Sequence, residues 1–263
     1  MKKYDKYKDS GIDEFGLVPW HWETWKISHA YKNIGSGTTP ESGNSDYYEN
    51  GVVYWLNTSD LNNANLEICP KKITEKALED YSALKIYPRG SLIVAMYGAT
   101  IGKLGLVNFE TTVNQACCVF SNSNVVQNEF MFFWFLSNTN LIVNLSKGGG
   151  QPNISKEILS NIKFICPPLE EQTQIAKYLD YRTAQMDKLI ADKQKLIGLL
   201  NEERAALTNQ AVTKGLNPDV PMKNSGIEWL GEIPEHWEVW KLSHAFNKIG
   251  GGTTPESGNP IYH

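Results

Sequence analysis

The sequence predicts an α+β fold in which a mixed, strand-rich domain precedes one long helix of the coiled-coil type. Short β-favouring runs alternate with Gly, Asn and Ser turns up to the proline pair at 167–168. Beyond that pair, residues 169 to about 213 contain a single glycine and no proline, as a long helix requires. The opening of the chain also recurs near its end, which indicates more than one structural unit.

The first domain is predicted to consist mainly of strands. They are expected at residues 25–31, 52–56, 82–87, 91–97, 101–107, 112–120 and 162–165. The apolar block 129–136 is too aromatic, and too closely flanked by amide residues, for an exposed strand. We therefore expect a short buried helix in that block.

Residues 169 to about 213 are predicted to form one helix, which ends near Lys214 and Gly215. At about 1.5 Å per residue it is roughly 65 Å long, more than a compact domain of this size needs. Its apolar residues follow steps of three, four and seven, with Lys193 as a break. We call this set the helix stripe: Ile175, Leu179, Met186, Leu189, Ile190, Leu196, Ile197, Leu200 and Leu207. An apolar stripe of this length predicts a partner helix.

Residues 10–48 recur without a gap as residues 225–263, and 24 of the 39 aligned residues are identical. The second copy is too short to bury a core of its own. We therefore interpret the chain as half of a two-unit architecture, one full unit followed by the opening of a second. The expected parts are a folded domain at 1–168, a spacer helix at 169–216, and a linker with the start of an incomplete second domain at 217–263.

Composition predicts a folded, soluble protein. Hydrophobic residues make up 41% of the chain and charged residues 21%, with a formal net charge of -4. No stretch approaches 18 uninterrupted apolar residues, and the basic N-terminus leads into no apolar run, so we expect a cytoplasmic location and no membrane partner. The four cysteines lack disulfide or metal spacing, which predicts free, mostly buried thiols.

The catalytic and metal-binding motifs that can be tested are not satisfied. The segment Gly98–Leu104 has three residues, not four, between the glycines of a phosphate-binding loop, and it lacks the metal-ligating hydroxyl. The segment Gly35–Pro40 lacks the third glycine of a dinucleotide fingerprint. His21 and His29 lie among tryptophans, where a structural imidazole is expected. We predict no catalytic residue, no metal site and no cofactor bound by this chain.

Amide, hydroxyl and aromatic side chains gather on the predicted loops of the first domain, at Asn57–Ser59, Tyr97–Lys103, Asn114–Gln115 and 147–153. Asn and Gln can pair with adenine, and Lys can reach guanine or a phosphate. The same residue types are also ordinary turn formers. Residues 1–168 carry 15 basic and 16 acidic side chains, so no bulk positive charge favours nucleic acid. Composition leaves both interpretations open.

Several short motifs follow one another in order along the chain. They are Gly35–Pro40, Gly90–Val94, Gly98–Gly102, Asn114–Gln115, Gly150–Ile154, Pro167–Gln172, Ile175, Leu179–Asp180 and Ala211–Leu216. This succession covers the full chain and resembles the specificity subunits of type I restriction-modification systems.

The resemblance implies a non-catalytic DNA-recognition subunit. Members of that family carry two target-recognition domains, each followed by a long helix, and each domain reads one half of a bipartite site on double-stranded DNA. The two helices pack antiparallel and dock two modification subunits, which bind S-adenosylmethionine and methylate adenine. Restriction subunits complete the nuclease.

Carried over to this chain, the resemblance implies that residues 1–168 form a target-recognition domain that reads DNA from its loops. The candidate DNA-binding residues are Thr38, Thr39, Tyr97, Thr100, Lys103, Lys147, Gly149 and Gln151. Because nearly all of the second domain is missing, we expect two copies to pair through the helix stripe. Such a homodimer would read a palindromic, interrupted site, since symmetry in the protein is mirrored in the DNA.

Two other interpretations stay open. A coiled-coil scaffold with a carbohydrate- or protein-binding β-domain is suggested by the 8 Trp and 12 Tyr, and glycan binding without DNA binding would select it. A stand-alone enzyme that fuses recognition with methylation or cleavage would need an Asn/Asp-Pro-Pro-aromatic methylation motif. The chain's proline pair instead lies between Cys166 and Leu169.

Overall fold

The structure is a computed structural model that describes residues 4–13, 15–146 and 153–252. Contacts within the chain divide it into two compact units, Met1–Gln185 and Met186–His263. The boundary between them lies inside the long helix α6 (Leu169–Lys214). Strand-rich sheets combined with this helix confirm the predicted α+β class.

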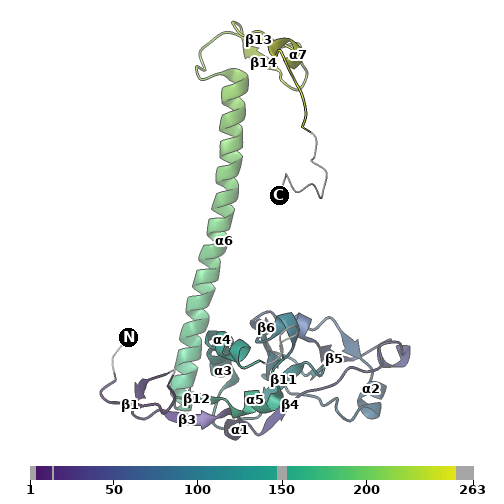
Figure 1. Ribbon diagram of the computed structural model, residues 1–263, viewed down its shortest axis with the longest axis vertical. Helices are drawn as coiled ribbons and strands as arrows, with labels where there is room; N and C mark the ends of the chain where they lie inside the picture. Colours follow the sequence, from purple (N-terminus) through teal and green to yellow (C-terminus); the bar gives the residue numbers. More distant parts are fainter. Residues whose placement is uncertain (1–3, 14, 147–152, 253–263) are drawn as a thin grey trace, which may run out of the picture. The chain divides into compact units, whose positions relative to one another are not determined.

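A mixed five-stranded sheet forms the centre of the first unit (Figure 1). Its strand order is β4-β11-β8-β9-β6, and β6 pairs parallel with β9 while the other neighbours are antiparallel. The strands are β4 (Asn33–Gly35), β6 (Ala64–Leu66), β8 (Leu92–Ala95), β9 (Leu104–Val107) and β11 (Cys117–Ser121).

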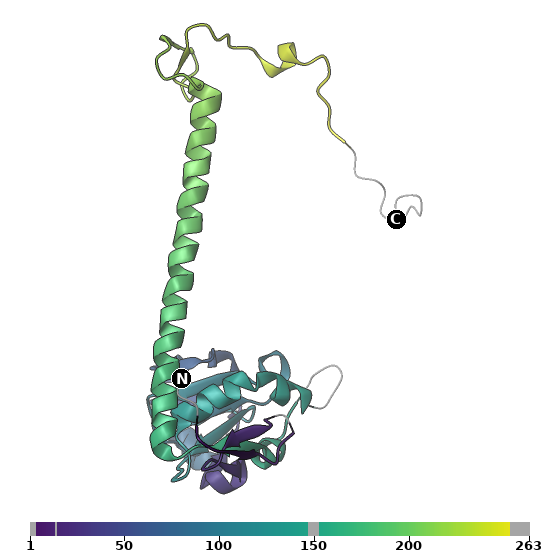
Figure 2. The ribbon, with the colours of Figure 1, turned by 90° about the vertical axis from the view of Figure 1, so that its left-hand side faces the viewer.

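The main core lies on both faces of this sheet. Successive side chains of a strand point to opposite faces, so Leu92 and Val94 join one apolar cluster while Ile93 and Ala95 join another. Helices cover the first face: α3 (Asn128–Ser137), α4 (Thr139–Asn144) and α5 (Lys156–Asn161). Figure 2 shows α3 and α4 in teal. The buried helix predicted at 129–136 is confirmed as α3.

The first unit also contains a smaller, three-stranded sheet with the order β10-β5-β7. The short helices α2, η1 and η2 lie next to its strands in the sequence. The elements are β5 (Val53–Leu56), β7 (Lys72–Ile73), β10 (Thr112–Val113), α2 (Glu75–Asp80), η1 (Ser45–Tyr47) and η2 (Thr58–Asp60). The single strand predicted at 112–120 is therefore wrong, because the chain leaves this sheet after β10 and enters the five-stranded sheet at β11.

Three further strand predictions need correction. At 25–31 the strand β3 (Glu23–Lys26) gives way to one helical turn, α1 (Ile27–Ala30), because a turn of helix buries Ile27 and Ala30 on one side. Residues 82–87 form no strand. At 101–107 the strand begins only at Leu104, because η3 (Gly98–Thr100) occupies the connection from β8.

The absence of a strand at 82–87 follows from burial at its two ends. Leu84 packs in the small cluster beside β5 and β7, whereas Tyr87 packs in the cluster under the five-stranded sheet. Tyr87 makes an isolated bridge to Thr111, and Pro88, which has no N–H group, follows it. The segment therefore connects two clusters and cannot extend along either sheet.

Two pairs of strands complete the first unit. The hairpin of β1 (Tyr7–Asp9) and β2 (Leu17–Pro19) opens the chain, and β12 (Lys163–Cys166) pairs antiparallel with β3. Only the residues Pro167 and Pro168 separate β12 from α6 (Figure 1). All four cysteines are buried and free, as predicted. Burial raises the pKa of the Cys166 thiol to about 11, so this thiol stays protonated at neutral pH.

The second unit repeats three elements from the opening of the first at matching positions. Strands β13 (Met222–Asn224) and β14 (Glu232–Pro234) pair antiparallel, and one helical turn, α7 (Leu242–Ala245), follows them. Each element lies 215 positions after its counterpart among β1, β2 and α1. Local hydrogen bonds recur as well, for example from Trp25 Nε1 to Glu23 Oε2 and from Trp240 Nε1 to Glu238 Oε2. The repeat in the sequence is thus a repeat in local structure.

The two copies differ in burial. Residues 238–241, the counterparts of β3, form no strand in the second copy. Ile27 is fully buried and Tyr31 is 5% exposed, whereas their counterparts Leu242 and Phe246 are 71% and 59% exposed. The first copy owes its burial to β12 and the helices around it. Within the described residues, the second copy finds no such core.

Candidate nucleic-acid interface

Three segments far apart in the sequence meet at one end of the five-stranded sheet. The connection from β8 to β9 lies beside the turn Asn114–Ala116, because Met96 N–H donates to Ala116 O at 2.8 Å. The loop after β4 joins the same turn through Gly37 N–H and Asn114 O, at 3.4 Å. We call this region the sheet-end site.

Three of the predicted DNA-binding residues, Tyr97, Thr100 and Lys103, lie together on the connection from β8 to β9. The Tyr97 side chain is 43% exposed, and the Lys103 side chain is exposed and has no ion-pair partner among the described residues. The Thr100 hydroxyl is engaged locally, because it donates to Tyr97 O at 3.0 Å. Among the described residues, Tyr97 and Lys103 are therefore the side chains here that are available to a ligand.

Thr38 and Thr39 lie at the same end of the sheet, but they differ in their exposure to solvent. Thr39 is exposed, and its hydroxyl donates to Gln115 Oε1 at 2.7 Å. Thr38 is half-buried, and its carbonyl accepts from Trp55 Nε1 at 3.1 Å. A Cβ added to Gly37 would overlap the carbonyl of Val113, so glycine is required for the loop to pass this close.

Lys147, Gly149 and Gln151 lie outside the described residues. The residues that follow this segment lie next to the site. Tyr97 forms an isolated β-bridge with Asn153, and Ile154 N–H donates to Met96 O at 2.9 Å. The structure therefore brings Thr39, Tyr97, Thr100 and Lys103 together. It also places the residues that follow the 147–152 segment beside them.

Gln115 belongs to the same site, although it was not among the predicted DNA-binding residues. Its carboxamide is exposed and is oriented by the Thr39 hydroxyl. The turn that carries it is fixed by Asn114, whose side chain accepts from Ala116 N–H and donates to Asn57 Oδ1, both at 3.1 Å. In the sequence, the amide-rich runs at Asn57–Ser59 and Asn114–Gln115 are the feature that points to this part of the site. The contact between the two runs could not be predicted, because 57 positions separate Asn57 from Asn114.

The helix stripe is divided between the two units. Ile175 packs against the main core of the first unit, and Leu179 lines an apolar groove beside it. The other seven members, from Met186 to Leu207, are each between 44% and 59% exposed in the second unit. Large apolar side chains with this much exposure, in one row of a helix, form a surface that favours a protein partner.

Gln172 fixes the start of α6. It is fully buried, and its Nε2 donates to Pro167 O at 2.7 Å and to Val125 O at 3.0 Å. Its Oε1 accepts from the N–H of Gln127, the residue before α3, at 2.8 Å. One side chain thus joins the first turn of α6 to the beginning of α3.

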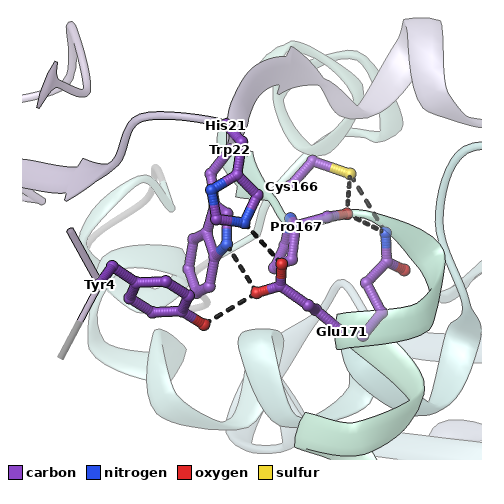
Figure 3. Close-up of polar contacts among 7 residues, drawn as sticks. Tyr4, His21, Trp22, Cys166, Pro167 and Glu171 are labelled. Carbon is purple, nitrogen blue, oxygen red and sulfur yellow. Dashed lines mark hydrogen bonds and ion pairs between the residues drawn. The ribbon is translucent and has the colours of Figure 1, made fainter. Parts of the chain in front are cut away.

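The neighbouring Glu171 holds the N-terminal segment against α6 (Figure 3). Its carboxylate accepts from the Tyr4 hydroxyl at 2.8 Å and from Trp22 Nε1 at 3.0 Å, and it lies 2.5 Å from His21 Nε2. His21 is thereby a structural imidazole, as predicted. Burial alone would raise the pKa of Glu171, but the hydrogen bonds from Tyr4, His21 and Trp22 outweigh it and lower the pKa below the usual 4.5.

This lowered pKa leads to a pH-dependent prediction. A carboxylate with a lowered pKa in the folded state contributes stability above its unfolded pKa and loses it as the pH falls through the folded value. We expect Glu171→Gln to be less stable than the wild type at pH 7, with the difference shrinking below about pH 4.5. Urea unfolding at pH 7 and at pH 3.5 measures both differences. Glu170→Gln, at the exposed neighbour, is the control, and a pH-independent deficit for Glu171→Gln would contradict the assignment.

Within the described ranges, no helix combines the length and the apolarity that crossing a membrane requires. No cluster of three or more His, Cys, Asp or Glu side chains in those ranges is arranged to hold a metal ion.

Comparison with solved structures identifies the fold. A chain in a structure described as "complex assembly and conformational transition of the type I R-M system" aligns with 80% of this chain and 49% of its own length, with a TM-score of 0.62 and 20% identity. The HsdS subunit from Thermoanaerobacter tengcongensis aligns with 80% of this chain and 48% of its own length, with a TM-score of 0.57 and 19% identity. These neighbours share the architecture of strand-rich sheets and a long helix.

Sequence comparison agrees. The specificity subunit of the type I restriction enzyme MjaVIII from Methanocaldococcus jannaschii is 30% identical over 240 residues, which are 90% of this chain and 52% of the relative. The chain thus spans about half the length of the relative and the solved chains that it matches. The family model described as "Type I restriction modification DNA specificity domain" matches residues 21–198, well over half of the chain. The chain belongs to the family of type I restriction-modification DNA specificity domains.

Proposed function

We propose that this chain is a non-catalytic subunit that recognises DNA for a type I restriction-modification complex. Family membership supports the general role, and the sheet-end site is the observation that carries it to particular residues. There, exposed amide, hydroxyl, aromatic and cationic groups from three segments occupy one end of a rigid sheet. Loops held in this way can enter a groove without much loss of conformational freedom.

The roles within the site follow from chemistry. Lys103, exposed and without an ion pair among the described residues, suits a phosphate or a guanine edge. Tyr97 offers a partly exposed ring and hydroxyl. The Thr39 hydroxyl donates to Gln115 Oε1, and the Gln115 amide N–H groups have no partner among the described residues. Such a carboxamide can pair with adenine or donate to a phosphate. Lys147, Gly149 and Gln151 remain candidates on the adjoining segment.

Replacing Lys103 by alanine is expected to weaken DNA binding several-fold and to reduce the salt dependence of binding by about one phosphate contact. The measurement is the anisotropy of a fluorescent random-sequence duplex pool, titrated at two salt concentrations with the modification subunits present. Lys32→Ala is the matched control, because Lys32 is an exposed lysine whose N–H bonds Asn122, past the other end of β11. Equal affinities for both variants and the wild type would remove Lys103 from the interface.

The exposed part of the helix stripe supports a second element of the proposal, a homodimer of two such chains. Continuing the heptad steps from Ile175 and Leu179 places Arg182, Lys193 and Glu203 in the stripe's seam. A parallel pair in register would set each of these charges against its own copy. An antiparallel pair avoids all three like-charge contacts. Its two helix dipoles also point in opposite directions, which is the favourable arrangement.

One antiparallel register pairs apolar residues in two of its layers. Setting Ile175 opposite Leu207 of the second copy also sets Met186 opposite Leu196. The three seam charges then face leucines, and Arg182 lies within one turn of Glu203 of the second copy. The paired chains would present two identical recognition domains to DNA. Such a particle reads a palindromic, interrupted site, each domain taking one half of the bipartite target.

The remaining parts of the proposal concern partners. We propose that the division into a recognition domain at 1–168, a helix at 169–216 and the start of a second domain at 217–263 reflects these roles, with the helix docking two modification subunits. Those subunits would bind S-adenosylmethionine and methylate adenine, and a restriction subunit would complete the nuclease. This chain's own residues would only bind DNA and position the partners.

A further inference from the structure

Three amide side chains meet at the sheet-end site, and the protein itself occupies two of them. Asn114 Nδ2 donates to Asn57 Oδ1 and Asn114 Oδ1 accepts from Ala116 N–H, both at 3.1 Å. Asn57 Nδ2 in turn donates to a backbone carbonyl of β5 at 3.3 Å. The side chain of Gln115 is exposed and, among the described residues, bonds only to Thr39. It is therefore the amide of this site that remains available to another molecule.

The backbone on both sides of Gln115 is held by hydrogen bonds to other segments. Before it, Asn114 N–H donates to the carbonyl of the last residue of β5 at 3.0 Å, and Asn114 O accepts from Gly37 N–H at 3.4 Å. After it, Ala116 O accepts from Met96 N–H at 2.8 Å. A side chain that starts from a backbone fixed in this way loses little conformational freedom when it meets a rigid ligand.

The Thr39 hydroxyl favours one orientation of the Gln115 carboxamide. The two ends of a carboxamide have nearly the same shape but opposite hydrogen-bonding character, because the oxygen accepts and the nitrogen donates. The hydroxyl donates to Gln115 Oε1 at 2.7 Å. Turning the carboxamide over would set its N–H groups toward Thr39 and would take this acceptor away from the hydroxyl proton. The bond therefore favours the orientation with Oε1 at Thr39.

In this orientation Gln115 presents a donor beside an acceptor. Its Nε2 hydrogens have no partner among the described residues, and Oε1 keeps its second lone pair. In the major groove, adenine offers the acceptor N7 beside the donor N6, so a carboxamide can pair with it through two hydrogen bonds. Guanine offers two acceptors, and its O6 would face Gln115 Oε1 with no hydrogen between them. The carboxamide thus matches adenine and disfavours guanine.

The side chains of the site divide two tasks between them. Lys103 is a cation, and a lysine contact to a phosphate forms with every DNA sequence. Gln115 is neutral, so a base edge is the contact in which its paired donor and acceptor are both used. The Thr100 hydroxyl donates to Tyr97 O within its own loop and leaves Gln115 unaffected. Lys103 is expected to act on affinity, and Gln115 on sequence preference.

We propose that Gln115 reads an adenine in the DNA half-site and that Thr39 is the positioning residue that orients its carboxamide. The inference rests on the proposed recognition of DNA and goes further, because it assigns one base of the target to one side chain. Asn57 and Asn114 hold the turn from which Gln115 projects. The same turn, without the Thr39 hydroxyl, would present the carboxamide in either orientation.

Methylation of a random-sequence DNA library by the full chain with its modification subunits, read out by sequencing, tests the assignment. In Gln115→Leu, which keeps a long side chain but has no hydrogen-bonding atom, the preference for adenine at one position of the half-site is expected to fall about tenfold. In Gln115→Glu the preference at that position is expected to move to cytosine, because a carboxylate accepts from the cytosine N4 amine. The other positions should keep their preferences in both variants.

Substitutions at Thr39 test the positioning role separately. Thr39→Val removes the hydroxyl and is expected to weaken the same preference about threefold, whereas Thr39→Ser retains the hydroxyl and should keep it. Lys103→Ala is expected to lower methylation at all sites without changing any preference. Asn161→Leu is the control, because Asn161 is an exposed amide at the end of α5 that donates to Glu157 O in its own helix.

The outcomes separate the assignment from the proposed function. If the wild type directs methylation to no defined sequence, the proposed function fails and the assignment falls with it. If the wild type defines a site and Gln115→Leu keeps every preference, or lowers methylation at all sites equally while circular dichroism shows it folded, Gln115 does not read a base. A Gln115→Leu variant that fails to fold leaves the decision to Gln115→Glu, whose unchanged preference for adenine would overturn the assignment. Equal preferences in Thr39→Val and the wild type would remove Thr39 alone.

Discussion

Replacing Gln172 by alanine is expected to lower the free energy of unfolding of the first unit by about 3 kcal/mol. The substitution leaves the Gln127 N–H without its partner, in a region where Gln172 itself is fully buried. It leaves the Val125 and Pro167 carbonyls only the weak Cys166 Sγ–H donor. It also opens a cavity where the side chain lay. Denaturant unfolding followed by tryptophan fluorescence measures the loss.

Gln174→Ala is the matched control for this prediction. Gln174 is the same residue type in the same turn of α6, but its side chain is exposed. We expect that variant to stay within about 0.5 kcal/mol of the wild type. A loss below about 1 kcal/mol for Gln172→Ala would mean that its buried hydrogen bonds are not what fixes the start of α6.

Replacing Leu200 by lysine is expected to convert the proposed homodimer into monomers at micromolar concentration. Leu200 belongs to the helix stripe, and the proposed antiparallel register sets it opposite Arg182 of the second copy. A second cation in this seam would face Arg182 and would cost several kcal/mol at each of two symmetric positions. Light scattering across a concentration series measures the change.

The adjacent residue supplies a close control. Leu199 and Leu200 are both 52% exposed, but Leu199 lies outside the stripe. Leu199→Lys should therefore leave the dimer intact, while helix content stays the same in both variants. If both substitutions weaken the dimer equally, the contact does not follow the stripe.

The long helix could be predicted from sequence nearly to its last residue. Proline at 168 and glycine at 215 mark its ends, and no other strong helix breaker than Gly198 lies between them. The buried helix α3 was equally clear, because few sequences are so apolar over one short block. Both helices depend on local composition alone, so one sequence is enough to predict them.

Features that depend on distant contacts could not be predicted in the same way. The run 112–120 looks like one strand, yet it enters two sheets, because Asn114 turns between partners that come from elsewhere in the chain. The bonds from His21 and Trp22 to Glu171 span about 150 positions. Gln115 belongs to the sheet-end site because the loop that carries Thr39, 76 positions away, folds beside it.

The most direct test of the account is methylation of a random-sequence DNA library by this chain together with its modification subunits, read out by sequencing of methylated adenine. We expect methylation at a palindromic site with an unspecified spacer, and none with the modification subunits alone. Methylation that is independent of this chain, or that falls on sites without such half-site symmetry, would contradict the proposal of paired recognition domains.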